Sequence, residues 1–419
     1  MQHPRTDEWT LSAYGSYITD QQRGDIADKA AELADVRVAH VNSTASGGGV
    51  AEILHSLVPL LNDVGVDTDW LVMEAPDGFF DVTKAIHNGL QGDRSEFTEA
   101  MRETYRSVTV ENAEALAGTY DVVVLHDPQT LGMAPTLAER FPGTAFVWRC
   151  HIDLTDATPA FLDFVRSYLE PVETAIFTLP EYGETISGVE RVTIHPAIDP
   201  LTVKNRPLEE LPAEPAEAAD LERYPFDAGR PLMLQISRFD PWKDPLGVID
   251  AYREVKESVP GVQLALVGAM PEDDPEGIEV YREVEDAAED DADVHLLTDV
   301  PDAGINALQR GADVVLQKSL REGFALTVSE ALWKGTPVVG ANVGGIPLQI
   351  EDGENGYLVE PEDVGATADR VTRLLEAESL RRRLGEGGHE TVRERFLTPR
   401  LVEDYLALLR DVAAGDHAG

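Results

Sequence analysis

The chain has 419 residues, of which 43% are hydrophobic, and its 77 acidic and 34 basic residues give a formal net charge of −43. This length predicts two domains, because single hydrophobic cores stop growing at about 250 to 300 residues. The acidic excess argues against nucleic acid and anionic membranes as partners, since both need a basic surface. No apolar run reaches the roughly 20 residues of a membrane span, so no membrane association is expected.

The acidic residues are spread along the whole chain, and only seven of the basic residues are lysine. Such a surface repels itself in dilute buffer, but at about 1 M salt the Debye length falls to about 3 Å and screening removes the repulsion. We therefore predict a protein from a halophile, with an acidic mesophilic protein as the alternative. Residues 1–22 are polar and unlike a signal peptide, which predicts a cytoplasmic location. The single cysteine, Cys150, should pack as a small buried hydrophobe.

Short β-branched runs alternate with helical stretches, which predicts an α/β protein with parallel sheets. Near the start, Ile26, Ala30 and Leu33 suggest an amphipathic helix. The first series of predicted strands covers 37–43, 69–73, 121–126, 145–151, 175–179 and 191–195. The second series covers 232–237, 263–267, 294–297, 313–316, 337–340 and 357–359. Apolar residues at helical spacing predict a closing helix over 399–413.

Residues rich in Pro, Glu and Ala separate the two series of strands. Because such stretches commonly join domains, we predict a first domain over 1–196, a linker region over 197–230 and a second domain over 231–398. The closing helix is expected either to end the second domain or to pack back on the first.

The first predicted strand leads through Ser46-Gly47-Gly48-Gly49 into a helix. Glycines let a ligand approach the backbone, and a helix N-terminus presents unpaired N–H groups, so Gly48 and Gly49 are candidates for binding a phosphate. A plain tight turn is the alternative. The spacing differs from the G-x-G-x-x-G fingerprint, which argues against a dinucleotide-dependent oxidoreductase.

Two cations, Arg238 and Lys243, follow the first strand of the second series. Ligands of open α/β sheets bind at the carboxyl ends of strands, so this pair is a candidate for holding a diphosphate. The alternative is a solvated loop with an ion pair to Asp240 or Asp244.

Two glutamates eight residues apart, Glu322 and Glu330, follow the strand predicted over 313–316. Gly323 is expected to open a helix, so that the N–H groups of Phe324, Ala325 and Leu326 point at an anion and Glu330 lies about two turns further on. Carboxylates accept hydrogen bonds from sugar or ribose hydroxyls.

Together with Arg238 and Lys243, this E-x7-E pattern resembles the retaining GT-B glycosyltransferases of family four. The segments 148–153 (WRCHID) and 237–244 (SRFDPWKD) resemble more closely the trehalose glycosyltransferring synthases, which make trehalose from a nucleotide-activated glucose and free glucose. The resemblance covers roughly residues 37 to 400. It implies the GT-B fold, in which two Rossmann-like domains face each other across a cleft. The N-terminal domain would lie on the acceptor side, and the C-terminal domain would bind the nucleotide sugar.

The resemblance also implies roles for individual residues. Glu322 would hold hydroxyls of the donor glucose and Glu330 the ribose, while Arg238 and Lys243 would stabilise the departing diphosphate. His151 would contact the 6-hydroxyl or the reacting face of the donor sugar, with a histidine satisfied within the core as the alternative. The implied donor-binding residues are Gly48, Gly49, Phe324, Ala325, Leu326 and Glu330. The candidates for contact with the acceptor, each of which could instead cap a helix, are Asp153, Arg149, Glu52, Asp127 and Gln129.

No cofactor is implied, because the nucleotide-glucose is a substrate and the leaving phosphate would take the acceptor's proton. The triplets Asp67-Thr68-Asp69 and Asp291-Ala292-Asp293 spell the D-x-D metal motif of another fold, but in so acidic a chain we interpret them as chance, and no metal is expected. The resemblance implies UDP- or ADP-glucose as the donor and glucose as the acceptor, and the oligomeric state is left open between a monomer and a homodimer. A retaining trehalose phosphorylase is the alternative, which Glu330 disfavours because no ribose would need it. A nonenzymatic nucleotide-sugar-binding regulator is less favoured.

Overall fold

The computed structural model describes residues 1–419 apart from 7–8, 47, 228, 270–274 and 416–419. The chain forms two compact units, one made of Met1–Ala197 with Thr398–Gly419 and the other of Ile198–Leu397. Each unit contains one six-stranded sheet, and every strand pairing within the sheets is parallel. The predicted α/β class is confirmed, and all twelve predicted strands are present.

The first sheet has the strand order β2-β1-β3-β4-β5-β6. Its strands are β1 (Arg37–Asn42), β2 (Asp67–Val72), β3 (Val122–His126), β4 (Ala145–Arg149), β5 (Val172–Phe177) and β6 (Glu190–Thr193). The central strands β1, β3 and β4 are buried almost throughout, as expected for a parallel sheet covered by helices on both faces.

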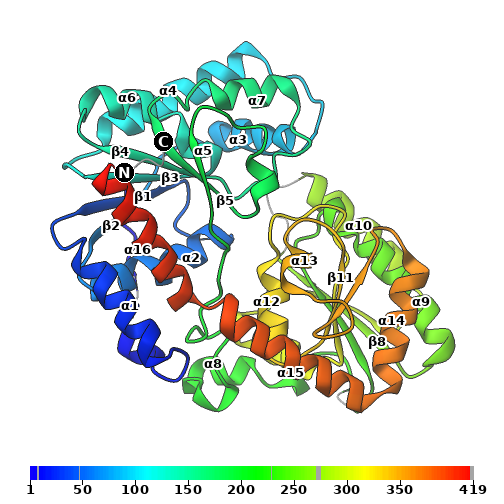
Figure 1. The fold of residues 1–419 in the computed structure, drawn as a ribbon. Helices are drawn as coiled ribbons and strands as arrows, with labels where there is room; N and C mark the ends of the chain where they lie inside the picture. The colour runs from blue at the N-terminus through cyan, green and yellow to red at the C-terminus, as the bar shows by residue number, and fades with distance from the viewer. Residues whose placement is uncertain (7–8, 47, 228, 270–274, 416–419) are drawn as a thin grey trace. The chain divides into compact units, whose positions relative to one another are not determined.

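The helices of the first unit form two layers around its sheet, with α3, α4, α6 and α7 on one face and α1, α2 and α16 on the other (Figure 1). They are α1 (Asp20–Ala31), α2 (Gly49–Asp63), α3 (Asp77–Leu90), α4 (Glu99–Ala115), α5 (Asp127–Leu131), α6 (Ala134–Arg140), α7 (Pro159–Arg166) and α16 (Thr398–Ala414), with short 3₁₀ turns η1 (Leu11–Tyr14) and η2 (Pro180–Gly183). Trp148, Phe161 and Tyr105 are among the large side chains buried in the core of this unit.

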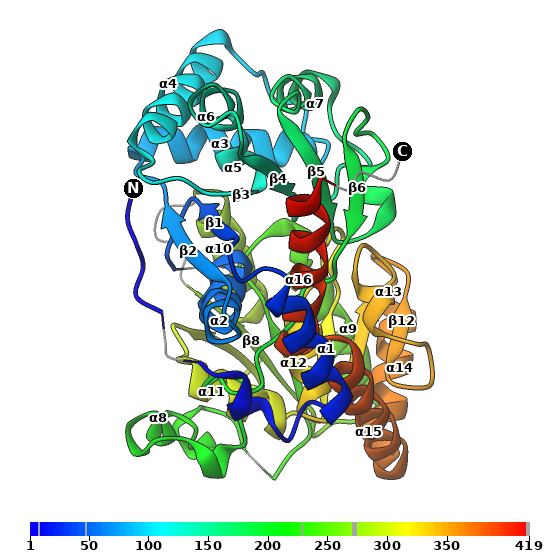
Figure 2. The same ribbon diagram turned by 60° about the vertical axis from the view of Figure 1, so that its left-hand side comes forward.

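The helix predicted near the start and the closing helix both exist, and they pack on each other. Helix α1 begins after a capping box in which Thr19 and Gln22 each bond the other's backbone N–H. It lies beside α16, and Lys29 on α1 bonds Glu403 on α16 at 2.7 Å (Figure 2). Helix α16 therefore belongs to the first unit, although the chain reaches it only after completing the second.

The second sheet has the order β12-β11-β10-β7-β8-β9. Its strands are β7 (Leu232–Ile236), β8 (Gln263–Gly268), β9 (Val294–Thr298), β10 (Val314–Gln317), β11 (Val338–Ala341) and β12 (Tyr357–Val359). Its helices are α9 (Pro245–Ser258), α10 (Pro275–Ala288), α11 (Asp302–Gly311), α12 (Leu326–Trp333), α13 (Ile346–Gln349), α14 (Val364–Glu376) and α15 (Glu378–Arg395), with η5 (Pro241–Lys243) after β7. Apolar side chains of α9, α10 and α14 pack with β7, β8 and β10 in one core.

The segment between the two series of strands packs on the second unit. It contains η3 (Leu208–Glu210), α8 (Ala213–Ala218) and η4 (Leu221–Arg223), all of which contact α11. Asn306 on α11 donates from Nδ2 to the backbone oxygens of Val203 and Arg206, at 2.9 and 2.8 Å. These contacts make the segment part of the second compact unit.

Among the helices of the described residues, none combines the length and the apolar character that a bilayer crossing requires.

Candidate active site

Lys243 and Glu322 meet at the carboxyl ends of two neighbouring strands of the second sheet. Lys243 ends η5 after β7, and Glu322 follows β10, which pairs with β7. The Lys243 Nζ lies 2.5 Å from Oε2 of Glu322. Gln317 Nε2 and Ser319 Oγ each lie 3.2 Å from the same oxygen. The strand order therefore brings a cation and a carboxylate, far apart in sequence, to one point with both side chains mostly buried.

The loop that carries Lys243 is fastened to the loop that carries Glu322. The Leu320 N–H donates to the Trp242 carbonyl oxygen at 2.7 Å, and the Arg321 guanidinium lies 5.1 Å from the centre of the Trp242 ring. Buried Lys318 pairs with Asp244. These contacts hold the two loops together without any ligand.

Arg238 is placed differently from Lys243. Its side chain is 70% exposed and pairs with Asp240 at 3.0 Å, which is one of the ion pairs considered from the sequence. A 70% exposed guanidinium in a single surface ion pair is held weakly, so it is available to an incoming anion.

The helix after Glu322 starts later than the sequence suggested. Helix α12 begins at Leu326, so Glu330 lies four residues, about one turn, into it instead of two turns. Two features of the turn account for this: Ala325 has a left-handed backbone with φ 69°, and Gln349 Nε2 donates to the Phe324 carbonyl at 2.5 Å. Of the three predicted N–H donors, only Leu326 belongs to the helix, and Phe324 and Ala325 form the turn before it.

The turn after β11 packs directly on this helix start. A Cβ atom on Gly345 would lie 2.7 Å from the Phe324 Cα, so no larger residue fits without a shift. Gly344 has a φ of 55°, which glycine adopts at least cost. The Gly344-Gly345 pair therefore fixes the position of the backbone that precedes α12.

Glu330 is buried, with 3% of its surface exposed, and it already has partners. Its Oε1 lies 3.6 Å from Lys204 Nζ, and its Oε2 lies 3.5 Å from Gln309 Nε2. Lys204 was not singled out from the sequence, because it lies in the segment interpreted as a linker. A ribose at Glu330 would have to share this carboxylate with Lys204.

Lys334 is the C-cap residue of α12, four residues after Glu330. Lys334 donates from Nζ to Asn205 Oδ1 at 2.8 Å and to the Glu330 carbonyl at 3.2 Å. Its burial lowers its pKa to about 7, although Glu330 acts in the opposite direction. Lys204, Lys243 and Lys318 likewise pair with carboxylates of the second unit.

In the first unit, the glycine turn precedes α2. Gly48 is the N-cap of this helix with a φ of 112°, Gly49 is its first residue, and Glu52 lies in its first turn. Gly47 lies outside the described residues. Asn42, at the end of β1, fixes the loop: its Nδ2 donates to the Thr44 carbonyl at 2.6 Å.

Apart from Glu52, the acceptor candidates from the sequence end or follow β3 and β4. These strands pair with His126 opposite Arg149. Asp127, with a φ of 60°, accepts the His151 N–H at 2.8 Å. Burial raises the pKa of the Asp127 carboxyl to about 6, against the effects of that hydrogen bond and of Arg149.

Two of these side chains carry buried polar atoms without partners among the described residues. Arg149 is 1% exposed, and its Nε and Nη1 have no hydrogen bond. The Oε1 of Gln129 is also buried and has no hydrogen bond among the described residues. Buried polar groups are normally paired, so these atoms are available to a polar ligand.

Two other residues of the WRCHID segment have local roles. Asp153 Oδ1 accepts from the N–H and the hydroxyl of Thr155, at 2.9 and 2.7 Å, which closes a local turn, and Asp153 is not the N-cap of α7. Cys150 is buried, as predicted, and burial together with nearby Asp127 raises its thiol pKa.

Three histidines of the first unit are bonded in series. His40 Nδ1 lies 3.0 Å from His126 Nε2, and His126 Nδ1 lies 3.3 Å from His151 Nε2. His40 and His126 are buried, and His151 is partly buried. Burial lowers the pKa of all three, that of His40 to about 3, so all three are neutral near pH 7. His40 was not noticed in the sequence, where its one signal is a polar residue inside an apolar strand.

His40→Phe should make the free energy of unfolding less dependent on pH between about pH 6 and 4. The unfolded imidazole takes up its proton near pH 6.5, whereas the folded pKa is about 3. Between these values only the unfolded state is protonated, so stability falls as pH falls, by about 1.4 kcal/mol per pH unit for this group. Denaturant titrations at fixed molar salt measure the slope. Equal slopes in the two proteins would show that His40 is not buried in its neutral form.

Both D-x-D triplets are engaged in ion pairs. Arg37 pairs with Asp67 and Asp69. Lys256 pairs with Asp291 and Asp293, and Arg230, which also bonds Asp293, contributes most to lowering the pKa of that carboxyl to about 2. Within the described part of the chain, no group of three or more His, Cys, Asp or Glu side chains is placed to hold a metal ion.

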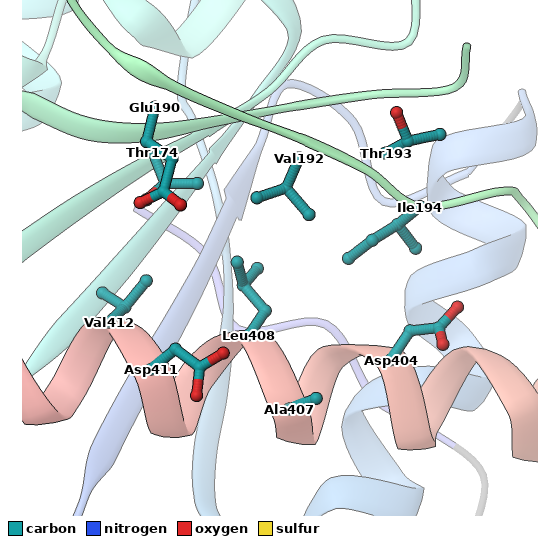
Figure 3. Close-up of a pocket in the computed structure, with 10 residues that line it drawn as sticks. All are labelled: Thr174, Glu190, Val192, Thr193, Ile194, Asp404, Ala407, Leu408, Asp411 and Val412. Carbon is teal, nitrogen blue, oxygen red and sulfur yellow. The ribbon is translucent and has the colours of Figure 1, made fainter. Parts of the chain in front are cut away.

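A pocket of about 210 Å³ lies between β6 and α16 in the first unit (Figure 3). Its walls include apolar Val192 and Leu408 and acidic Glu190, Asp404 and Asp411. None of the candidate site residues lines it, so it contributes nothing to the site at the strand ends.

Comparisons with known proteins agree with this fold. Residues 217–391 match the family described as "Glycosyl transferases group 1", and residues 40–184 match "Trehalose synthase, N-terminal domain". A solved structure, "Trehalose-6-phosphate from E. coli bound with UDP-2-fluoro glucose", superimposes with a TM-score of 0.71 at 14% identity, covering 89% of this chain and 99% of that one. The two Rossmann-like units thus form a glycosyltransferase of the GT-B fold.

Sequence relatives narrow this class. The trehalose synthase of Thermococcus litoralis is 44% identical over 405 residues, which is 95% of this chain and 96% of that protein. The trehalose phosphorylase of Pleurotus pulmonarius is 28% identical over 397 residues, 84% of this chain but 54% of that protein. The chain belongs to the trehalose synthase family.

Proposed function

We propose that this enzyme transfers glucose from a nucleotide-glucose, UDP- or ADP-glucose, to free glucose with retention of configuration, forming trehalose in a reversible reaction. The observation that carries the proposal is the contact of Lys243 with Glu322 at the strand ends of the second unit. A cation suits a departing diphosphate, and a carboxylate suits sugar hydroxyls. The E. coli relative, which is bound to UDP-2-fluoro glucose, supports a nucleotide sugar as donor.

In this proposal, the second unit binds the donor. The diphosphate lies against Lys243, Arg238 and the N-terminus of α12, where unpaired N–H groups and the helix dipole favour negative charge. Glu322 accepts hydrogen bonds from the glucose hydroxyls, and Glu330 accepts from the ribose. Binding the diphosphate draws Lys243 from the carboxylate toward the phosphate oxygens, so Glu322 turns to the sugar.

The chemical step then needs position and charge more than a dedicated base. As the bond from the anomeric carbon to the diphosphate breaks, Lys243 and Arg238 stabilise the charge that develops on the leaving group. The acceptor hydroxyl attacks the same face, and the leaving phosphate takes its proton. Arg149, Asp127, Gln129, Asp153 and Glu52 are proposed to bind the acceptor glucose, and His151 to contact the donor sugar.

The same protein is proposed to work in a salt-rich cell interior. The net charge of −43 and the small number of lysines support this proposal, because concentrated salt screens the mutual repulsion of the acidic groups.

We expect an α-linked product formed from free glucose, at a rate that a chelator leaves unchanged. The reason is that the proposed stabilisers of the diphosphate are the side chains Lys243 and Arg238 and the start of α12. The protein is incubated in molar salt with glucose and each nucleotide-glucose in turn, with and without EDTA, and the disaccharide is identified. A β-linked product, or a loss of activity in EDTA that magnesium restores, would contradict the proposal.

A parallel reaction separates the synthase from the phosphorylase. Trehalose is incubated with inorganic phosphate in one sample and with a nucleoside diphosphate in the other. If trehalose is cleaved only in the sample with phosphate, with release of glucose 1-phosphate, the protein is a phosphorylase and the proposed activity is wrong.

A further inference from the structure

The series His40, His126 and His151 links the core of the first unit to a residue proposed to contact the sugar. The three residues come from neighbouring strands: His40 lies on β1, His126 ends β3, and His151 follows β4. The rings of His126 and His151 are nearly parallel, with an interplanar angle of 15° and centres 5.6 Å apart. The order of the strands in the sheet therefore places the three histidines next to one another.

Because the rings are neutral, the tautomer of each ring determines the tautomer of the next. A neutral imidazole has one N–H and one bare nitrogen, and each bond in the series needs one of each. Only two arrangements satisfy both bonds. Either every ring donates toward His151, or every ring donates toward His40.

The buried end of the series favours one of these arrangements. His40 Nε2 is buried and has no hydrogen-bond partner among the described residues. If the rings donated toward His40, this atom would carry an N–H without an acceptor, and such orphaned buried donors are rare. If they donate toward His151, the atom is a bare nitrogen, and His151 accepts at Nε2.

We infer that His40 and His126 are positioning residues that hold His151 in its Nδ1–H tautomer. His151 is partly exposed, and its Nδ1 has no partner in the described part of the chain, so this nitrogen is open to a ligand. It then offers an N–H to a sugar oxygen and cannot take a proton at that atom. His151 is thereby a hydrogen-bond donor and not a general base, in keeping with a reaction in which the leaving phosphate takes the proton.

The inference rests on the proposed function only for the sugar contact, so two readouts are needed. The first is the tautomer of His151, measured in molar salt by two-bond ¹⁵N–¹H correlation on histidine-labelled protein, with His151→Gln to assign the signal. The second is kcat and donor KM. The tautomer needs no substrate, so a protein that transfers no glucose would refute the proposed function and leave the tautomer readable.

The wild-type protein should show the Nδ1–H tautomer at His151. His40→Phe, which keeps a ring but removes the first donor, should give a mixture of tautomers and a kcat lower by about 10-fold with donor KM within about twofold. His40→Asn places an amide N–H where the imidazole Nδ1–H was and should restore the tautomer and most of kcat. His295→Phe is the matched control, since His295 is a histidine of the second unit whose Nε2 is also buried without a partner.

An Nε2–H tautomer at His151 in the wild type would overturn the inference, and this result requires no variant to fold. An unchanged tautomer in folded His40→Phe would also overturn it, because a role in packing alone would leave the proton of His151 where it was. If His40→Phe does not fold, the inference is tested by two other results: the tautomer of His151 in the wild type, and its tautomer together with kcat in His40→Asn.

Discussion

Lys243→Ala should lower turnover about 100-fold and change donor KM much less. If Lys243 stabilises charge that develops on the diphosphate, its loss raises the barrier more than it weakens donor binding, by about 3 kcal/mol as for one preorganised donor at an oxyanion site. The variant also removes the ammonium that lies 2.5 Å from the Glu322 carboxylate. Steady-state kcat and donor KM measure the effect. Lys243→Arg should recover only part of it, since a planar guanidinium does not replace a compact ammonium.

Matched controls separate this effect from the loss of an ordinary ion pair. Lys29 is 23% exposed and bonds Glu403 at 2.7 Å, whereas Lys243 is 17% exposed and bonds Glu322 at 2.5 Å. Arg382 is 71% exposed, close to the 70% of Arg238, and also faces a carboxylate. Lys29→Ala and Arg382→Ala should keep normal turnover. If Lys243→Ala and Arg238→Ala stay within about twofold of these controls, the diphosphate does not bind at the pair.

Transfer from molar salt to about 50 mM salt should unfold the protein and abolish its activity. The excess of 43 negative charges repels itself over more than about 10 Å at that ionic strength, but over only about 3 Å in 1 M salt. Many carboxylates are largely exposed to solvent, including those of Glu99, Asp163 and Glu386, whose side chains are 73%, 72% and 74% exposed. Circular dichroism and activity across a potassium chloride series measure the transition.

A neutral osmolyte at equal osmolarity is the control for this transition. If the screening of charge by salt keeps the protein folded, the osmolyte should not restore folding or activity at low salt, because it carries no charge. Full activity that persists after dialysis into about 50 mM salt would refute the proposed salt-rich setting.

The strands could be predicted from the sequence because each is a short apolar run bounded by polar residues. The start of α12 could not, since the left-handed Ala325 depends on Gln349, which comes from the other side of β11. Lys204 was missed for a related reason: a Pro-rich stretch gives no periodic signal, and only packing on α11 brings it to Glu330. The contact of His40 with His126 could not be predicted either, because it forms only when β1 lies beside β3. Patterns of local spacing thus predicted the strand-end candidates, whereas the partners that hold these residues come from distant parts of the chain.

The return of α16 to the first unit has a consequence for how the protein is made. The second unit, Ile198–Leu397, is one continuous stretch, whereas the first lacks α16 until the last residues have been synthesised. Tyr405 on α16 lies against His40, with ring centres 5.5 Å apart, so this part of the first sheet is not covered by α16 until the end of translation. The half of the enzyme that leaves the ribosome first is therefore the half that completes its folding last, because α16 can join it only after the whole second unit has been synthesised.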